Sequence, residues 1–338
     1  MGFTLTSDWA RRRYSYAAVL GLTGLGAAFP AEAGWLLGLP LAVGMVLLGV
    51  AHGACDQFVV PAQDRASGGT PTLGGWGYWL RFLAGYLGLA AGVGLLWWGW
   101  PAATVAGFLL LTVWHWGSAD APAGAQVART RWLAHSLLRG LLVFAVPAWH
   151  WPAETADVVN GLLRFAGAAP MAPAAYAGAA GALLWVVAGG HIVAWTAYAA
   201  ARQWAQVRSD LMEVLVLVAL FGGLPPRLSV AVYFVFWHSL QHMFRLNGWL
   251  GYAGASRAGA DLLPQLVFFL RRAAPLLLLS CAALLVLGTL LAPRLPDPAA
   301  WFSLALVVAS VVTLPHALLV TLVMDAPQWR RTQPTSML

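Results

Sequence analysis

The chain has 338 residues, of which 60% are hydrophobic and only 9% are charged, and its formal net charge is +7. So little charge cannot cover a water-soluble protein of this length, which excludes a soluble enzyme or binding module. All 19 basic residues are arginines that lie between apolar runs, so we interpret them as determinants of membrane orientation and expect no nucleic-acid partner.

Apolar runs of about 20 residues recur along the whole chain, and each is long enough to cross a bilayer as a helix. We place the expected spans at 15–30, 34–60, 76–99, 102–119, 132–149, 174–200, 210–224, 228–247, 264–292 and 300–324. The run 210–224 is short and the run 264–292 contains two arginines, so we expect eight to ten spans. The sequence therefore predicts an all-α, polytopic membrane helix bundle. We expect a single integral-membrane domain over residues 1–338, with short tails at about 1–14 and 325–338.

Arginine and acidic residues separate between the two ends of the expected spans. With the N-terminus inside, the inner segments carry most arginines, including Arg11–Arg13, Arg129 and Arg131. The outer segments carry Glu32, Glu154, Asp157 and Asp297. Because cytoplasmic loops are enriched in arginine, we expect both termini in the cytoplasm.

A pair of histidines stands in an otherwise apolar run, "VYFVFWHSLQHMFRL" at residues 232–246. Because four residues turn a helix by about 400°, His238 and His242 lie on one face, roughly 6 Å apart along the axis. His52, in "GVAHGACDQF", and His115, in "TVWHWGSAD", fall at a similar depth, roughly 5–12 Å from the inner ends of their spans. Three expected helices thus deliver imidazoles to one membrane layer, where ionisable side chains usually mark a site.

Depth alone does not single out these four histidines. The same inner half contains three more, His135, His191 and His316. His150 lies near the outer face. Two further features favour the set: the pair shares a face, and Asp56 and Asp120 follow His52 and His115 by four and five residues. A ligating imidazole commonly donates its second N–H to a carboxylate, so each aspartate could support its own or a neighbouring helix's histidine.

Each of these features also has a simpler explanation. A single membrane histidine often only hydrogen-bonds a neighbouring helix, and a pair four residues apart can arise from packing or bind haem, zinc or iron. Together the segments favour a metal site. Neutral nitrogens without a thiolate suit iron, copper or zinc. Hydrolytic zinc is disfavoured, because "WHSLQH" lacks the glutamate that acts as base in metalloproteases.

Five segments, taken together, resemble a known family. "LLGVAHGACDQF", "VWHWGSAD", "RGLLVFAVPAWHWPAET", "VYFVFWHSLQHMFRL" and "TLPHALLV" have the order and character of the bacteriorhodopsin-related-protein-like β-carotene 15,15′-dioxygenases, from about residue 45 to residue 325. The resemblance implies a bacterial or archaeal membrane enzyme that cleaves β-carotene with dioxygen to two retinal molecules. It also implies Fe(II) bound by His52, His115, His238 and His242. The chain departs from the family pattern at Gln57, where histidine is expected, and at Trp116, where phenylalanine is usual.

The resemblance implies partners and a location as well. The substrate is β-carotene, the surroundings are membrane lipid, and a microbial rhodopsin is a candidate acceptor of the retinal. We expect a multi-pass protein of the bacterial cytoplasmic membrane. Aromatic residues close to the histidines in sequence are candidates for lining the substrate site. They are Trp114, Trp116, Phe234, Trp237 and Phe244.

Three further residues have open roles. Tyr233 is a candidate catalytic residue that polarises oxygen or stabilises a carbocation, against plain core packing. Arg139 lies in the apolar run "HSLLRGLLVFAV", where it either pairs with one of the two aspartates and orients the histidines or snorkels to the interface. His316, after Pro315, is expected in a supporting position or along the substrate path.

Two other classes of protein fit part of the pattern. A transporter or proton-relay protein would use the histidines and aspartates as a pathway, but the sequence has no visible internal repeat of the kind common in transporters. A membrane haem or di-iron protein is the other alternative, although the chain has one His-x-x-x-His where di-iron enzymes need several histidine boxes. The roles of His135, His150 and His191 stay open.

Overall fold

The computed structural model describes residues 5–66, 75–121, 128–252, 261–295 and 297–329, and the regular structure of this part of the chain is helical throughout. The long helices and their continuations, in chain order, are α1 (Leu5–Ala28), α2 (Ala33–Gly44), η1 (Met45–Val50), η2 (Gly53–Phe58), α3 (Val59–Ala66), α4 (Trp76–Gly99), α5 (Pro101–Asp120) and α6 (Arg129–His150). They are followed by α7 (Pro152–Phe165), α8 (Pro173–Ala200), α9 (Trp204–Gly223), α10 (Pro226–Val232), η3 (Tyr233–Ser239), α11 (Leu240–Trp249), α12 (Leu262–Leu291), η4 (Ala292–Arg294), α13 (Pro298–Leu319), η5 (Val320–Met324) and α14 (Ala326–Trp329).

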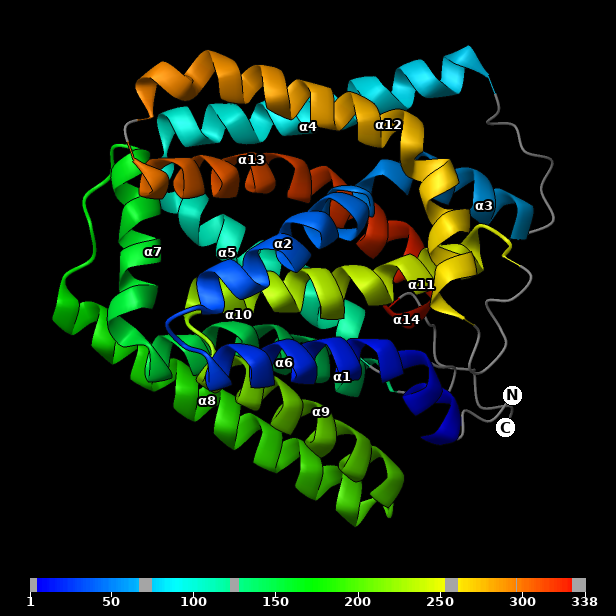
Figure 1. The fold of residues 1–338 in the computed structure, drawn as a ribbon. Helices are drawn as coiled ribbons and strands as arrows, with labels where there is room; N and C mark the ends of the chain where they lie inside the picture. Colours follow the sequence, from blue (N-terminus) through cyan, green and yellow to red (C-terminus); the bar gives the residue numbers. More distant parts are fainter. Residues whose placement is uncertain (1–4, 67–74, 122–127, 253–260, 296, 330–338) are drawn as a thin grey trace.

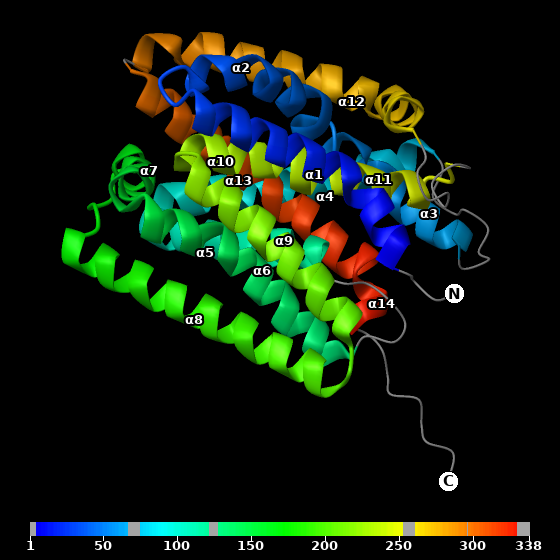
Figure 2. The same ribbon diagram turned by 60° about the horizontal axis from the view of Figure 1, so that its bottom comes forward.

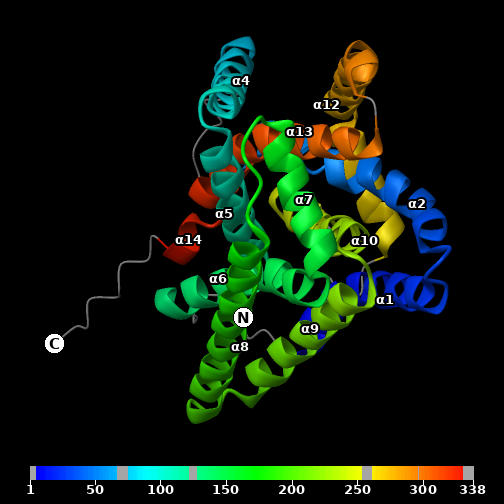
Figure 3. The same cartoon turned by 90° about the vertical axis from the view of Figure 1, so that its left-hand side faces the viewer.

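Most of these helices run along one common direction, which is horizontal in Figure 1. The start of α1 and the short α14 lie at the same end of the bundle in both Figure 1 and Figure 2. This arrangement is the one expected if both ends of the chain lie on the same side of a membrane. Helix α7 is the exception: it lies across the opposite end of the bundle, as the view along the bundle in Figure 3 also shows.

Within the described part of the chain, seven helical segments are long and apolar enough to cross a membrane. They are Ala33–Gln63, Trp76–Gly99, Pro101–Asp120, Arg129–His150, Pro173–Ala200, Leu262–Arg294 and Pro298–Met324. Three further helical stretches, α1, α9 and the continuous α10–η3–α11, coincide with the other expected spans but carry more polar side chains. The predicted all-α, polytopic membrane bundle is therefore confirmed, and seven clear spans plus these three stretches are consistent with the expected count.

Most of the exposed tryptophans of the described residues lie at the two ends of the bundle; Trp185, in the middle of α8, is the exception. One end, where α4 and α6 finish and α2 and α13 begin, carries Trp35, Trp98, Trp100, Trp149 and Trp301. The other end, where α4 and α9 begin, carries Trp76 and Trp204. Tryptophan concentrates at membrane–water interfaces, so these two groups bound the membrane-spanning layer.

Two helices depart from the simple spans expected from hydropathy. Residues 152–165, between two expected spans, form the amphipathic helix α7, which buries Leu162 and Leu163 against the bundle. Helix α12 contains Pro275, and Figure 1 shows it sharply bent. A proline removes a helical hydrogen bond and bends the helix. The part that carries Arg271 and Arg272 thereby turns away from the bundle axis, which explains two charges inside an apolar run.

Three helices widen locally into π-helical turns, and all three carry histidines. The segment η1 ends two residues before His52, η3 contains His238, and η5 begins four residues after His316. A π turn inserts an extra residue, changes the direction of the side chains that follow, and occurs frequently at functional sites. These irregular turns are the first structural sign that one region of the bundle has a special role.

Helices α5 and α6 cross with their backbones in contact at two glycines. A Cβ atom at Gly117 would lie 1.8 Å from the carbonyl oxygen of Ser136, and one at Gly140 would lie 1.8 Å from that of Val113. Small residues allow membrane helices to approach this closely. The crossing sets the position of α5, and therefore of His115, two residues before Gly117.

We expect Gly117→Ala to lower the free energy of unfolding by about 1–3 kcal/mol or more, because the added methyl group meets a backbone oxygen that cannot rotate away. Gly107→Ala on the same helix is the control, since a Cβ there meets no atom within 4 Å. Denaturant unfolding in mixed micelles measures the difference. Equal stability of the two variants would contradict the close crossing.

Candidate metal centre

Five histidines converge in the part of the bundle nearest the start of α1. His52 follows η1, His115 lies in α5, His238 in η3, His242 in α11 and His316 in α13. Their ring centroids lie 4.8 to 6.5 Å apart in the neighbouring pairs. Four separate parts of the chain therefore deliver imidazoles to one small volume.

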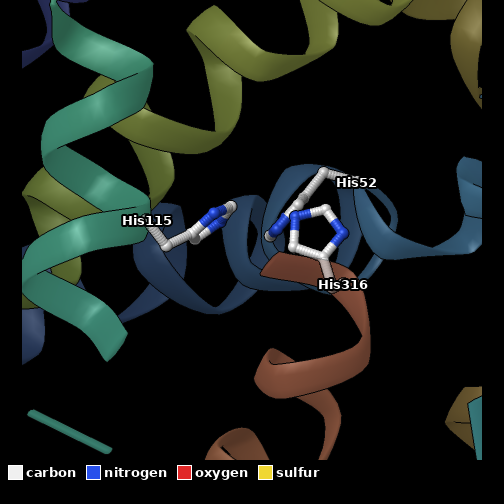
Figure 4. Close-up of side chains that lie close together, drawn as sticks. All are labelled: His52, His115 and His316. Atoms are coloured by element: carbon white, nitrogen blue, oxygen red, sulfur yellow. The ribbon is translucent and has the colours of Figure 1, made fainter. Parts of the chain in front are cut away.

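Three of these histidines present ring nitrogens to one another at the spacing of metal ligands. One nitrogen each of His52, His115 and His316 lies within 4.8 Å of the other two. Figure 4 shows the three rings directed toward a common point from three different helical segments. The rings of His238 and His242 lie nearly parallel, with an interplanar angle of 14° and centroids 6.3 Å apart, which confirms that the pair shares a face.

The hydrogen bonding of these rings fits a bound metal. All five histidines are buried, yet six of their nitrogens have no hydrogen-bond partner among the described residues. These are Nδ1 of His115, both nitrogens of His238 and of His242, and Nε2 of His316. A buried nitrogen without a partner is costly, and a metal ion satisfies it. A cluster of imidazoles without thiolates suits iron, copper or zinc.

Two hydrogen bonds orient the rings of His316 and His52 through their Nδ1 atoms. The Asp56 carboxylate accepts a hydrogen bond from His316 Nδ1 at 2.9 Å, which leaves Nε2 facing the cluster. His52 Nδ1 lies 3.2 Å from the carbonyl oxygen of Leu48, and since a carbonyl can only accept, Nδ1 carries the proton and Nε2 is free to bind a metal. Such partners fix the tautomer and direction of metal-binding histidines.

His316 lies closer to the candidate metal site than the sequence indicated. We expected a supporting role or a place along the substrate path, whereas one of its ring nitrogens lies within ligand spacing of His52 and His115. It is therefore a fifth candidate ligand. From the sequence, only its depth in the inner half was visible; no spacing relates His316 to Asp56, which is 260 residues away.

Asp120 does not support a histidine among the described residues. Both of its carboxylate oxygens accept from Trp237 Nε1, at 3.0 and 2.8 Å, and one accepts from the Tyr233 hydroxyl at 3.3 Å. The side chains of Tyr233 and Trp237 are fully buried. The two aromatic residues therefore hold Asp120 from within the core.

The remaining aromatic candidates divide into two groups. Trp116 and Phe234 lie beside the cluster: Phe234 stacks on His238 with centroids 6.0 Å apart, and Trp116 is 5.9 Å from Phe234. Phe144, which the sequence did not indicate, stacks on Trp116 and extends this row of rings. By contrast, the other two rings face away from the cluster: Trp114 contacts Trp132, and Phe244 contacts Tyr14.

Neither expected environment of Arg139 is correct. Its guanidinium is 1% exposed, so it does not snorkel, and it forms ion pairs with Asp210, at 3.0 Å, and with Glu213. Both acids lie in α9. A buried charge requires partners of this kind, and the α9 acids lie closer than either aspartate of the histidine segments.

The other three histidines lie outside the cluster. His135 Nε2 is 3.1 Å from Asp210 and belongs to the same buried group of charges as Arg139. His191 Nδ1 lies 2.9 Å from its own helix's Val187 carbonyl oxygen. His150 is exposed at the opposite end of α6, as predicted from the topology.

Comparison with known proteins bears directly on this site. A model of the family described as beta-carotene 15,15′-dioxygenase matches residues 43–324, which include all five histidines. A protein of Halobacterium salinarum, described as "Probable beta-carotene 15,15′-dioxygenase Blh", is 32% identical over 306 residues, with 83% of each chain covered. No solved structure matches the chain.

The Asp56–His316 contact leads to a prediction for metal binding. We expect Asp56→Asn to weaken binding of a divalent transition metal by about 10- to 100-fold, since an amide orients the ring and raises its basicity less than a carboxylate. Titration calorimetry with Co(II) on the metal-free protein measures the change. Asp157→Asn, at an exposed site on α7, is the control. Equal affinity in both variants would remove Asp56 from the metal site.

Proposed function

Because the chain belongs to the β-carotene 15,15′-dioxygenase family, we propose that it is a membrane-embedded, iron-dependent dioxygenase. It cleaves the central 15,15′ double bond of β-carotene with dioxygen and releases two molecules of all-trans-retinal. The observation that supports this proposal best is the group of five buried imidazoles with unpaired nitrogens. We place the protein in the bacterial cytoplasmic membrane with both termini in the cytoplasm.

Four histidines would hold the Fe(II), namely His52, His115, His238 and His242, and His316 is the fifth candidate. When bound, Fe(II) supplies an open coordination position at which dioxygen is activated. The chain's own contribution is to keep the imidazoles oriented: Asp56 accepts from His316, and the Leu48 carbonyl accepts from His52. No thiolate or carboxylate need enter the ligand set.

The overall reaction does not require acid–base catalysis. Each of the two carbons of the cleaved bond takes one oxygen atom of O2 and becomes an aldehyde, so no proton is added or removed overall. This balance suits a site in which the nearest carboxylates, Asp56 and Asp120, are both bound by donors. Tyr233 remains the proposed residue for polarising oxygen or stabilising a carbocation, a role that requires no proton transfer.

The row of rings beside the histidines would hold the substrate. Phe144, Trp116 and Phe234 follow one another at centroid distances of 6.2 and 5.9 Å and lead to His238. β-Carotene is an uncharged, rigid polyene that dissolves in the hydrocarbon core, so it can approach between helices without entering water. Aromatic and apolar walls bind such a ligand and exclude water during cleavage. Transfer of retinal to a microbial rhodopsin rests on the family resemblance alone.

Expression in a β-carotene-producing bacterium tests the activity. We expect the orange colour to fade and retinal to appear in the extracted pigments. His52→Ala, His115→Ala, His238→Ala and His242→Ala should each abolish retinal formation, because each removes a proposed ligand. His150→Ala, at the opposite end of the bundle, should retain it. Persistent orange colour with intact, iron-supplied protein would overturn the proposal.

Purified protein tests the cofactor and the oxidant. We expect a chelator to remove activity and Fe(II) to restore it, whereas Zn(II) should bind without restoring it because zinc does not activate dioxygen. With ¹⁸O2 and rapid reduction of the aldehydes to alcohols, each retinal-derived product should carry one labelled oxygen. Full activity with Zn(II), or label entering from water alone, would contradict an iron-dependent dioxygenase.

A further inference from the structure

We propose that the N-terminal helix α1 is a positioning element, which holds the helix of His238 and His242 by the face next to the one that carries the two histidines. This inference rests on the proposed metal site. The family model begins at residue 43 and so assigns nothing to α1, which ends at Ala28. The residues that carry the proposal are Arg12, Ser15 and Tyr16, and their spacing places them on one face of α1.

The contacts of α1 fall on the residues that immediately precede the two histidines. Gln241 Nε2 donates to Ser15 Oγ at 2.7 Å, and Ser15 is fully buried. The ring of Tyr16 meets that of Trp237 edge to face, with centroids 5.5 Å apart and planes at 80°. Neighbouring residues on a helix differ in direction by about 100°, so α1 can hold Trp237 and Gln241 while the histidines face the cluster.

Arg12 extends this contact to two further elements. Its guanidinium forms an ion pair with Glu213 of α9 at 3.0 Å and donates to the main-chain carbonyl of Asp120, the last residue of α5, at 3.3 Å. It also lies 5.7 Å from the centre of the Trp237 ring, within the range of a cation–π interaction. Asp120 in turn binds the Trp237 indole, so Arg12 connects α5, α9 and η3 at one point.

The histidine helix has a physical need for such support. His238 lies in the π-helical segment η3, where the wide turn breaks the regular backbone pattern and leaves the direction of the side chain less fixed by the helix itself. Contacts from outside the helix can then determine where the ring points. Arg12, Ser15 and Tyr16 supply polar and aromatic contacts of fixed geometry, which a purely apolar helix–helix contact lacks. They touch no ligand atom, so they act as positioning residues.

Co(II) binding to the full-length protein tests the proposal, because the visible absorption of Co(II) reports how its ligands are arranged. The variants are Ser15→Ala, which removes the partner of Gln241, and Arg12→Gln, which removes the charge. The matched control is Thr23→Val, a buried hydroxyl on the same helix with no hydrogen-bond partner among the described residues. We expect both variants to weaken Co(II) binding about 10-fold and to change its absorption bands, as the loss of outer-shell support does.

The kinetics of β-carotene cleavage with Fe(II) provide a second measurement. We expect Ser15→Ala and Arg12→Gln to lower kcat with little change in KM for β-carotene, and Arg12→Lys to restore part of the loss. Thr23→Val should match the wild type in both measurements. Should Arg12→Gln not fold, a double-mutant cycle of Ser15→Ala and Gln241→Met still tests the proposal. The two single losses in Co(II) affinity should not add in the double variant, because both substitutions remove the same hydrogen bond.

The outcomes separate the two proposals. Wild-type Co(II) affinity and absorption in folded Ser15→Ala and Arg12→Gln would overturn the role of α1, whether or not the protein cleaves β-carotene. Additive losses in the Ser15–Gln241 cycle would overturn it as well. A wild-type protein that binds Co(II) with α1-dependent affinity but produces no retinal would overturn the proposed function and leave the positioning role standing.

Discussion

Buried imidazole nitrogens without partners are the constraint on which this structure depends. Each unsatisfied polar group in a protein interior costs about 1–3 kcal/mol, and six such nitrogens lie within one cluster of five rings. Inside a membrane no bulk water is available to compensate them. A bound cation can coordinate one nitrogen of each ring and so offsets part of this cost, which is the strongest reason to regard the bundle as a metal protein.

Bringing five rings together requires four parts of the chain to meet at short range, and local backbone features make this meeting possible. Direct contact between α5 and α6 at Gly117 and Gly140 fixes the helix of His115. The π turns at His52 and His238 change the directions of side chains that a regular helix would spread around its circumference. The 3₁₀ segment η2 then places Asp56 at His316.

The sequence predicted those parts of this arrangement that depend on local periodicity. Apolar runs gave the helices, and four-residue spacing gave the shared face of His238 and His242. The sequence could not predict contacts between distant segments: Asp56 meets His316 across 260 residues, and Arg139 meets Glu213 across 74. The π turns were also missed, because they depend on how a helix packs against its neighbours. The bend of α12 was missed as well, although Pro275 within the apolar run is a sequence signal for it.

Ion pairs explain how a cationic metal can lie in the same membrane layer as three arginines. Arg12, Arg139 and Arg245 would each repel a divalent ion through a medium of low dielectric constant. Arg245 is paired with Asp325, which leaves Arg12 and Arg139. The acids of α9 lie directly against them, with Glu213 paired to both arginines and Asp210 to Arg139, so two positive and two negative charges offset one another. The histidine cluster is thus left with Asp56 as its hydrogen-bonded carboxylate among the described residues, and one negative charge beside neutral imidazoles favours a cation there.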